Sequence, residues 1–426
     1  MFRSFIFLAL ASAAAAQTPA LVIKAVTDRP QALYQTGETA RFDLTVTQDG
    51  KPLAQGQIQC SLSKDGVEPK REETVPIKDG KATLTGTLSE PGFLLLRASI
   101  TGQNDFAQAS AGFSPQEIKP SLPVPDDFDA FWAAQKAALA QVEMKSTLTP
   151  VTSTLPKVDV YDAQITCLGA PVSGYYAKPK DAKAKSCPAI LFVHGAGVGG
   201  SSLGAVAWSE REGGMLSMDI NAHGLPNGKP KAFYDEQAAG ALKDYRFQGR
   251  DDREKCYFKG MFLRVIRALD FLTAQPEWDG KTLIVYGSSQ GGFQAFAAAG
   301  LDSRVTFFCA GVPAGCDHTG IAAGRINGWP KLVTITDGKA VEAELQTARY
   351  FDNVNFAIRA KCQGAAVTVG FIDTVCPPSS VYAAYNVLTM PKTMHPMPLT
   401  GHKSSPDASD FMTEAALAHV RAMRQQ

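Results

Sequence analysis

Polar and apolar residues alternate along the first quarter of the chain. The segment "ARFDLTVTQDG" alternates and ends in a turn, and "KDGKATLTGTLSEPGFLLLRASI" contains two more strand-like runs, separated by the turn-forming pairs DG and PG. No helical period occurs in this part of the chain. Several short strands within about 95 residues predict a small all-β domain, a β-sandwich of immunoglobulin-like type, over residues 20–114.

The pattern changes after a proline-bearing connector, residues 115–125. The segment "DDFDAFWAAQKAALAQV" begins with acidic residues and continues in good helix formers, so we expect Asp126 or Asp127 to cap a helix. Apolar side chains recur at helical spacing, which predicts an amphipathic helix packed on a core. These side chains belong to Phe128, Phe131, Trp132 and Leu139.

From about Lys157 onward, short unbroken apolar runs alternate with segments of helical period. Such runs are typical of strands buried on both faces. Alternating strands and helices predict a mostly parallel sheet with helices on both faces, so the fold class expected for residues 115–426 is α/β. The strand-like segments are "PAILFVHG", "GGMLSMDI", "KTLIVYG", "VTFFCAGVP" and "AAVTVGFID", and the helical ones are "FKGMFLRVIRALDFLTA", "GGFQAFAAAGL" and "DFMTEAALAHVRAMR".

The N-terminal segment "MFRSFIFLALASAAAAQTPA" has the three parts of a secretory signal peptide. Arg3 supplies the positive start, a short apolar run follows, and small residues precede Gln17. We expect cleavage after Ala16, so that residues 1–16 direct export to the periplasm or the medium. The apolar run is too short to span a bilayer, and no second stretch of spanning length follows, so no membrane insertion is expected.

Composition narrows the classes of partner. The chain has 426 residues, of which 45% are hydrophobic and 19% charged, and its formal net charge is +1. This length favours more than one domain, and the absence of a like-charge block gives no indication of nucleic-acid binding. The eight cysteines include no CxxC pair, so no zinc pattern is present. Most should be buried apolar packing, although export would allow one or two disulfides.

The segment "YGSSQGGFQA" lies between a predicted buried strand and a predicted helix. Within it, Gly287-Ser288-Ser289-Gln290-Gly291 fits the G-x-S-x-G pattern of a nucleophile elbow. Such a turn strains the backbone of the central serine, lifts its hydroxyl above the sheet, and leaves room only for small residues at the flanking glycines. The alternative is an ordinary glycine-rich turn, but the strand before and the helix after favour Ser289 as a nucleophile.

A serine nucleophile needs a base, and in an elbow fold the base follows the acid along the chain. Four histidines come after Ser289. His318 lies early, His395 precedes a proline, and His419 falls within the last predicted helix, where packing or solvation is the ordinary role. His402, in the polar segment "LTGHKSS" just before that helix, is the favoured base.

The favoured acid is Asp373, at the end of the predicted strand "AAVTVGFID". A carboxylate at the C-terminal end of a parallel strand faces the same edge as the elbow. The 29 residues that separate it from His402 leave room for a helix and a short strand. Asp352 is the weaker rival because it lies in a helix-like stretch, and Asp317 and Asp410 fit the expected geometry less well.

Acyl transfer also requires hydrogen-bond donors for the developing oxyanion. One donor should be the backbone N–H of Gln290, the residue after the nucleophile. The second should come from the loop in "LFVHGAG", where Ala196 is the first choice and Gly197 the second. For His194 in the same loop, a structural role is at least as well supported as a catalytic one.

Five segments together resemble the acetyl xylan esterases related to cephalosporin-C deacetylase: "DFDAFW", "FVHGAG", "PEWDGKTLIVYGSSQGG", "GFIDTVCPPSSVYAAYN" and "GHK". They run from about Pro125 to the end of the chain. The resemblance implies an α/β-hydrolase fold and a serine esterase that releases acetate from acetylated sugars without a metal or other cofactor. By position, Ser289, Asp373 and His402 match the family's triad, and Gln290 and Ala196 match its oxyanion hole.

The chain departs from that family at several places. Ala196 stands where an aromatic residue is usual, and "NAHG" at residues 221–224 replaces the usual R-G-Q-G. Residues 227–252 fit no family pattern and are expected to form a cap over the site. The all-β domain is an addition, which would obstruct the ring-like oligomers of the family, so the oligomeric state stays open.

The leading hypothesis is an exported serine esterase that deacetylates xylan or xylo-oligosaccharides. A broader ester hydrolase or a peptidase on the same fold is the first alternative, although a peptidase of the prolyl type would carry a longer preceding domain. A non-catalytic glycan-binding protein with a relic hydrolase domain is the second. The intact set of serine, aspartate and histidine, in the expected order, argues against the relic.

Overall fold

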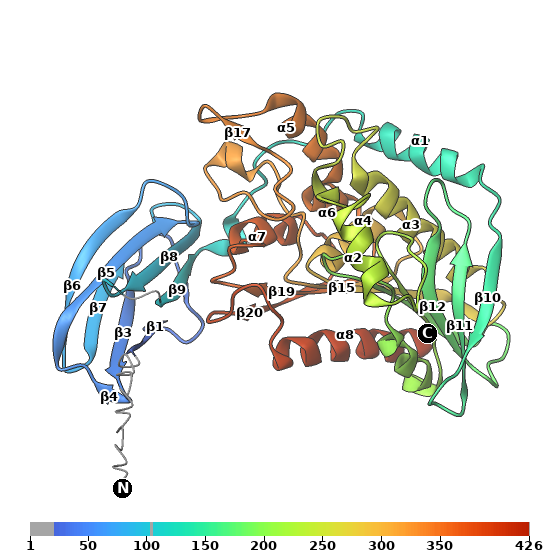
Figure 1. Ribbon diagram of the computed structural model, residues 1–426, viewed down its shortest axis with the longest axis horizontal. Coiled ribbons are helices and arrows are strands. Elements are labelled where there is room, and N and C mark those ends of the chain that lie inside the picture. The colour runs from blue at the N-terminus through green and yellow to red at the C-terminus, as the bar shows by residue number, and fades with distance from the viewer. Residues whose placement is uncertain (1–20, 103–104, 426) are drawn as a thin grey trace, which may run out of the picture.

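The computed structural model describes residues 21–102 and 105–425, and Figure 1 shows an all-β region followed by a larger α/β region. The predicted signal peptide, residues 1–16, lies outside the described residues. The fold class expected from the sequence is confirmed: strands fill the first region, and a mixed sheet with helices fills the second.

The N-terminal β-region, residues 21–113, is built from strands whose side chains alternate between core and solvent. In β3, for example, Ala40, Phe42 and Leu44 are buried while their neighbours are more exposed. Its strands follow the order β1-β3-β7-β6-β5-β8-β9-β2, with β4 beside β3. Among the described residues, a single residue pair joins β6 to β7, and the strands of this region surround a core of their own. The strands are β1 (Leu21–Thr27), β2 (Leu33–Tyr34), β3 (Ala40–Gln48), β4 (Lys51–Pro52), β5 (Gln55–Lys64), β6 (Arg71–Lys78), β7 (Lys81–Gly86), β8 (Gly92–Ser99) and β9 (Phe106–Phe113).

The α/β region contains one large sheet of order β10-β11-β12-β14-β13-β15-β16-β19-β20. Its first four strands pair antiparallel, and the pairs from β14 to β20 are parallel. The strands are β10 (Ser146–Val151), β11 (Val158–Ile165), β12 (Val172–Pro179), β13 (Cys187–Val193), β14 (Leu216–Ile220), β15 (Trp278–Ser288), β16 (Phe307–Gly311), β19 (Gly364–Gly370) and β20 (Lys392–Met397), with a separate hairpin of β17 (Ile335–Thr336) and β18 (Lys339–Ala340).

Helices cover both faces of this sheet, as the buried strands predict. Alternate residues of β13 face opposite ways: Leu191 joins the core beneath α3 and α4, while Ile190 joins the core beneath α8. Figure 1 shows α8 below the sheet and α1, α3, α4 and α6 above it. The helices are α1 (Phe128–Ala140), α2 (Lys231–Ala239), α3 (Tyr257–Thr273), α4 (Gln290–Leu301), α5 (Glu342–Ala348), α6 (Asn353–Arg359), α7 (Pro378–Asn386) and α8 (Pro406–Arg424), with short 3-10 turns η1 (Pro115–Glu117), η2 (Leu203–Gly213), η3 (Tyr245–Phe247), η4 (Gly320–Ala323) and η5 (Arg349–Phe351).

Helix α1 forms where the sequence predicts it, but its cap differs from the prediction. Asp127 precedes the first helical residue, yet its side chain makes no capping hydrogen bond. The carboxylate instead accepts hydrogen bonds from Tyr350 and from Arg253, the latter at 2.7 Å. These long-range partners compete with the local backbone for Asp127, so this carboxylate joins α1 to distant segments.

All eight cysteines lie in the described part of the chain, and all are buried free thiols. The expectation of apolar packing is therefore confirmed, and the one or two disulfides that export would allow do not form. Between residues 21 and 425, apart from 103–104, no helix is long and apolar enough to cross a membrane.

Candidate active site

Ser289 occupies a strained turn between β15 and α4. Its backbone has φ 57° and ψ −121°, a conformation that non-glycine residues rarely adopt. The surrounding backbone holds it there: its N–H donates to Gly311 O at 2.8 Å, and its carbonyl accepts from Phe293 and Ala314 at 3.1 and 3.0 Å. Strain that is fixed by several bonds in this way is typical of functional sites.

The two glycines that flank Ser289 are required by close backbone contact. A Cβ atom on Gly287 would lie 2.6 Å from the backbone of Gly291, and one on Gly291 would lie 2.3 Å from the carbonyl oxygen of Val193. Backbone atoms cannot move aside as a flexible side chain can. The G-x-S-x-G spacing therefore reflects the close packing of β15, α4 and β13 at this turn.

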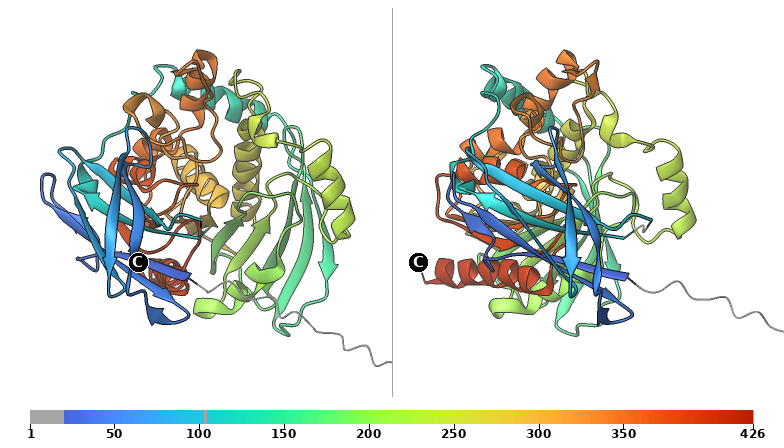
Figure 2. Two further views of the ribbon diagram at one scale, coloured as in Figure 1. Left: turned by 60° about the vertical axis from the view of Figure 1, so that its left-hand side comes forward. Right: turned by 90° about the vertical axis from the view of Figure 1, so that its left-hand side faces the viewer.

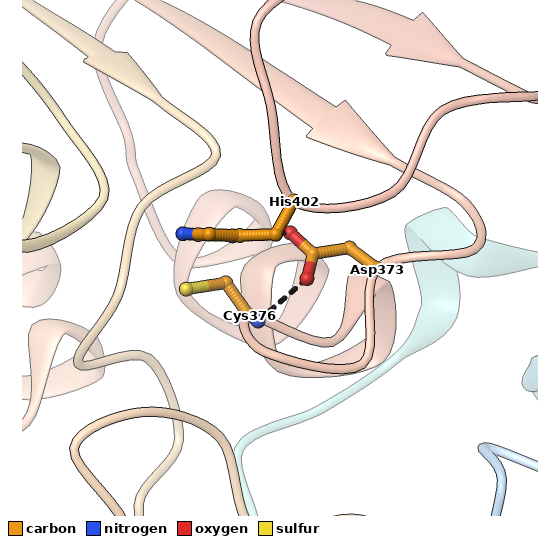
Figure 3. Close-up of side chains that lie close together, drawn as sticks. All are labelled: Asp373, Cys376 and His402. Atoms are coloured by element: carbon orange, nitrogen blue, oxygen red, sulfur yellow. Dashed lines mark hydrogen bonds and ion pairs between the residues drawn. The ribbon is translucent and has the colours of Figure 1, made fainter.

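The three residues proposed for the triad come together at the carboxyl edge of the sheet. Ser289 Oγ lies 2.9 Å from His402 Nε2, and His402 Nδ1 lies 2.8 Å from Asp373 Oδ2. An ionised carboxylate only accepts, so Nδ1 carries the proton and Nε2 is free to accept from the serine hydroxyl. Figure 3 shows the Asp373 carboxylate beside the His402 ring.

Asp373 is buried and oriented by the loop that follows it. Its side chain is 1% exposed, and its second oxygen, Oδ1, accepts from the N–H groups of Val375 and Cys376, each at 2.8 Å. These bonds leave Oδ2 directed at the imidazole. The geometry suits a carboxylate that fixes one histidine tautomer and stabilises its charged form.

The rival residues lie in other environments. Asp352 caps α6 and accepts from Val354 at 2.9 Å, and burial together with Asp317 raises the pKa of its carboxyl. Burial lowers the pKa of the His318 imidazole to about 3 and that of His419 to about 4. His318 and His419 are therefore buried packing residues. His395 lies near the surface, where its ring pairs with Asp407 at 3.0 Å.

The proposed oxyanion donors are the backbone N–H groups of Gln290 and Ala196. Gln290 is the first residue of α4, where the backbone N–H groups of a helix are unpaired, and no acceptor for its N–H occurs among the described residues. The loop of Gly195, Ala196 and Gly197 is exposed, and a Cβ on Gly195 would lie 4.0 Å from Ser289 Cβ. Gln290 therefore directly follows the nucleophile, and the loop that carries Ala196 approaches Ser289 at Gly195.

A network of aromatic and polar side chains, which no sequence pattern predicted, supports this loop. The hydroxyl of Tyr245 donates to Gln290 Oε1 at 2.6 Å, and Gln290 Nε2 reaches the carbonyl oxygen of Gly195 at 3.4 Å. His223 Nε2 lies 2.9 Å from Gly197 O, so it donates, and its Nδ1 accepts from Tyr257 at 2.7 Å. Burial lowers the pKa of His223 to about 4, which keeps the ring neutral.

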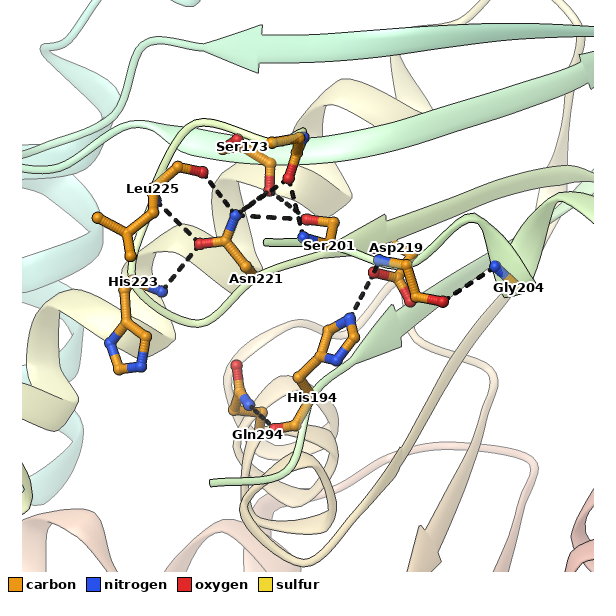
Figure 4. A network of polar contacts seen from close by, with 11 residues as sticks. Ser173, His194, Ser201, Gly204, Asp219, Asn221, His223, Leu225 and Gln294 are labelled. Atoms are coloured by element: carbon orange, nitrogen blue, oxygen red, sulfur yellow. Dashed lines mark hydrogen bonds and ion pairs between the residues drawn. The ribbon is translucent and has the colours of Figure 1, made fainter. Parts of the chain in front are cut away.

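The contacts of His194 are structural. The sequence supported this role at least as well as a catalytic one. Its ring lies 2.5 Å from the buried carboxylate of Asp219, and its carbonyl accepts from Gln294 at 3.0 Å, as Figure 4 shows. Burial tends to lower the pKa of His194, but the hydrogen bond and charge of Asp219 outweigh it and the net shift is upward. His194 thereby ties the start of the oxyanion loop to β14 and α4.

The segment "NAHG" is also structural. The buried side chain of Asn221 donates to Leu225 O at 2.8 Å and accepts from the N–H groups of Leu225 and His223 at 2.9 and 3.3 Å (Figure 4). These bonds hold the turn that carries His223 beneath the oxyanion loop. Two of the departures from the family pattern, residues 221–224 and 227–252, meet where the rings of His223 and Tyr245 pack edge to face, with centroids 4.6 Å apart.

The segment expected to form a cap, residues 227–252, contacts the site through the bond of Tyr245 to Gln290. Its helix, α2, has no buried side chain, and Tyr234 of that helix donates to Pro226 O at 2.8 Å. The cap over the site stays a prediction. The hydrogen bond from Tyr245 to Gln290 supports the oxyanion loop, because the Gln290 side chain also bonds to the Gly195 carbonyl.

Three side chains that could ligate a metal gather beside the serine. Atoms of Asp373, Cys376 and His402 lie within 4.8 Å of one another (Figure 3). Both carboxylate oxygens already accept hydrogen bonds, and burial followed by the charge of Asp373 raises the pKa of the Cys376 thiol well above its ordinary value. Metals bind cysteine as the thiolate, so this group suits proton transfer better than metal binding.

Similarity to known proteins agrees with this geometry. The chain matches the acetyl xylan esterase (AXE1) family over residues 115–419. It is 33% identical over 382 residues to acetyl esterase Axe7A of Xylanibacter ruminicola, which covers 87% of this chain and 84% of that protein. A Paenibacillus acetyl xylan esterase structure is 29% identical with a TM-score of 0.60, covering 71% of this chain and 98% of that one. Acetyl xylan esterase 1 from a Thermoanaerobacterium species shares the fold, with a TM-score of 0.61 at 24% identity and coverage of 71% and 97%. The chain therefore belongs to the acetyl xylan esterase family and is a carboxylic ester hydrolase.

Proposed function

We propose that this chain is an exported serine esterase that removes O-acetyl groups from acetylated xylan or xylo-oligosaccharides. The observation that carries the proposal is the continuous chain of hydrogen bonds from Ser289 through His402 to Asp373. This arrangement activates a serine for acyl transfer: the hydroxyl lies on a strained turn, the imidazole carries no proton on Nε2, and the carboxylate is buried.

In the first half of the reaction, Ser289 Oγ attacks the acetyl carbonyl carbon and its proton passes to His402 Nε2. The carbonyl oxygen becomes an oxyanion, which the backbone N–H groups of Gln290 and Ala196 are suited to receive. As the tetrahedral intermediate collapses, the bond between the carbonyl carbon and the sugar oxygen breaks. The sugar oxygen takes the proton from His402 and leaves as a hydroxyl, and the acetyl group stays on Ser289.

In the second half, a water molecule attacks the acetyl-serine ester and gives a proton to His402 Nε2. The same two N–H groups receive the second oxyanion. Collapse releases acetate, and the proton on His402 returns to Ser289 Oγ. Asp373 stabilises the charged imidazole in both halves without taking its proton.

The substrate class rests on similarity. A family described as acetyl xylan esterases and a relative named acetyl esterase favour an acetyl donor on a sugar. The first alternative is a broader ester hydrolase or a peptidase, because a fold does not fix a substrate. A relic domain without activity is the least supported alternative, since the serine, histidine and aspartate are within bonding distance.

The decisive measurement is acetate release by the protein and its Ser289→Ala variant from acetylated xylan and acetylated xylo-oligosaccharides. We expect release by the parent and a loss of several orders of magnitude in the variant. Serine-dependent cleavage of a simple aryl acetate without release from either sugar would reject the substrate and keep the chemistry. Equal activity of parent and variant on every ester would reject the nucleophile.

Export is tested separately, by the mass of the N-terminus after expression of the full chain in a host with a secretion pathway. We expect a mature chain that begins at Gln17 and accumulates outside the cytoplasm. A cytoplasmic protein that retains Met1 would overturn this part of the proposal alone.

A further inference from the structure

One phenylalanine of the N-terminal β-region, Phe93, packs in the core of the α/β region and not in the core of its own region. On the opposite face of β8, Leu94 and Leu96 pack inside the β-region. Phe93 is 1% exposed and instead belongs to the core of the α/β region. Its ring centroid lies 4.9 Å from that of Phe371, edge to face, and 5.6 Å from that of Tyr382.

These two partners stand at the two ends of the segment that carries Asp373. Phe371 directly follows β19 and precedes Asp373 by two residues, and Tyr382 lies within α7. Between them, the N–H groups of Val375 and Cys376 fix the Asp373 carboxylate at 2.8 Å. Phe93 therefore packs against both ends of residues 371–382, which we call the acid segment.

The position of Phe93 is itself fixed by its surroundings. Its N–H donates to Asp65 Oδ1 at 3.2 Å and its carbonyl accepts from Asp65 N–H at 2.6 Å. Gly112 on β9 lies so close that a Cβ there would be 2.8 Å from the Phe93 ring. The ring has no room to move away from the acid segment without a shift of β8.

The connector between the two regions is also attached to the α/β region. Asn386, at the end of α7, donates to the carbonyl oxygens of Pro115 and Ile118 at 3.0 and 2.8 Å. The hydroxyl of Ser121 donates to the buried carboxylate of Asp317 at 2.6 Å. Figures 1 and 2 accordingly show the β-region lying against the C-terminal part of the chain, from α7 to β20.

The contact with the segment before His402 is different in kind. There the two regions line a partly open pocket of about 330 Å³, with Val26 and Ala32 on one wall and Pro398 and Leu399 on the other. Leu399 is 61% exposed. Atoms across a gap lose their packing contacts, whereas Phe93 packs directly on Phe371 and Tyr382, so we take Phe93 as the more direct route from the β-region to the triad.

We propose that the N-terminal β-region is a working part of the esterase site, in which Phe93 is a positioning residue that holds the acid segment so that Asp373 stays bonded to His402. The proposal rests on the triad proposed above. Phe93 acts through its ring contacts with Phe371 and Tyr382. It acts on the direction of one carboxylate, and a displacement of about 1 Å from a productive geometry costs on the order of a hundredfold in rate.

The test compares Phe93→Ala with Phe42→Ala in the full chain. Both phenylalanines are buried in the same region, but Phe42 lies in the core confined to the β-region. With an aryl acetate, we expect Phe93→Ala to lower kcat about ten- to a hundredfold with KM changed less than about twofold. The acid limb of its kcat/KM profile should move to lower pH, because a misplaced carboxylate stabilises the charged imidazole less. Phe42→Ala, assayed per folded molecule, should keep kcat within about twofold.

Two milder variants keep the test decisive if Phe93→Ala does not fold. Phe93→Leu retains apolar packing and should restore most of kcat, and Gly112→Ala should lower kcat by displacing the ring without deleting it. Equal kcat losses in Phe93→Ala and Phe42→Ala, or unchanged kcat in both Phe93→Ala and Gly112→Ala, would overturn the proposal. Asp373→Asn, assayed beside them, distinguishes a failure of the proposed triad from a failure of the proposal on Phe93. If Asp373→Asn retains full activity, the triad itself is wrong, whatever the Phe93 variants do.

Discussion

The hydroxyl of Tyr245 donates a hydrogen bond of 2.6 Å to the side-chain oxygen of Gln290, and the amide nitrogen of the same side chain reaches Gly195 O. The Gly195 carbonyl and the Ala196 N–H belong to one peptide plane and point in opposite directions. By holding the carbonyl, Gln290 fixes the direction of the N–H. Gln290 thus contributes its backbone to one side of the proposed oxyanion hole and its side chain to the other.

Replacing Tyr245 with phenylalanine removes one hydroxyl from this arrangement. We expect kcat to fall about fivefold with KM nearly unchanged, which corresponds to the roughly 1 kcal/mol of a buried hydrogen bond now lost to oxyanion alignment. Steady-state kinetics on an aryl acetate measure this effect. Tyr234→Phe is the matched control, because among the described residues its hydroxyl bonds only to the nearby backbone of Lys229 and Pro226. An equal loss in both variants would mean that the segment matters only for stability.

The Asp373→Asn variant tests the histidine tautomer. An amide can donate to Nδ1, so it favours the tautomer with the proton on Nε2, which cannot accept from Ser289. We expect kcat to fall by about 10⁴ with little change in folding. Asp407→Asn is the control, because Asp407 also contacts a histidine, His395, but near the surface. A loss of less than about tenfold for Asp373→Asn would contradict the proposed role of the carboxylate.

The elbow itself makes a prediction about stability. Gly291→Ala places a Cβ 2.3 Å from the backbone oxygen of Val193, so we expect a loss of about 2 to 3 kcal/mol and a fall in Tm of about 5 to 10 °C. Gly199→Ala, where nothing lies within 4 Å of the added carbon, should leave Tm within about 2 °C. Thermal unfolding followed by circular dichroism separates the two, and equal Tm values would show that the elbow relaxes easily.

The parts of the site that were predicted from sequence are those that local patterns encode. The strand, the two glycines and the small-residue helix around Ser289 are contiguous, and chain order then limits the choice of base and acid to few residues. Burial of the cysteines also followed from residue type. In each case the physical constraint acts between neighbours in sequence or on the residue alone.

The supports of the site were not predicted, because their partners are distant in sequence. Tyr245 is 45 residues from Gln290, and Phe93 is 278 residues from Phe371. Asp127 shows the same limit: its position predicted a cap, but Tyr350 and Arg253 engage its carboxylate in the fold. The sequence differed from the family pattern at "NAHG" and at residues 227–252, where some of these supports lie. Those differences did not identify the contacts that the residues make.

The last prediction concerns pH and a histidine outside the site. His419 on α8 is buried against Phe307 and bonded to Thr306 at 2.9 Å, and burial lowers its pKa from 6.5 to about 4. The unfolded chain therefore takes up a proton between pH 6.5 and 4 that the folded protein does not, so stability falls as pH falls through this window. Between pH 7.5 and 5.0 this residue alone should account for about 2 kcal/mol of the loss. His419→Gln and His419→Phe cannot titrate, so urea unfolding at the two pH values should show a drop smaller by about that amount in each variant. If the drop equals that of the parent in both, His419 is protonated in the folded protein and its burial does not hold it neutral.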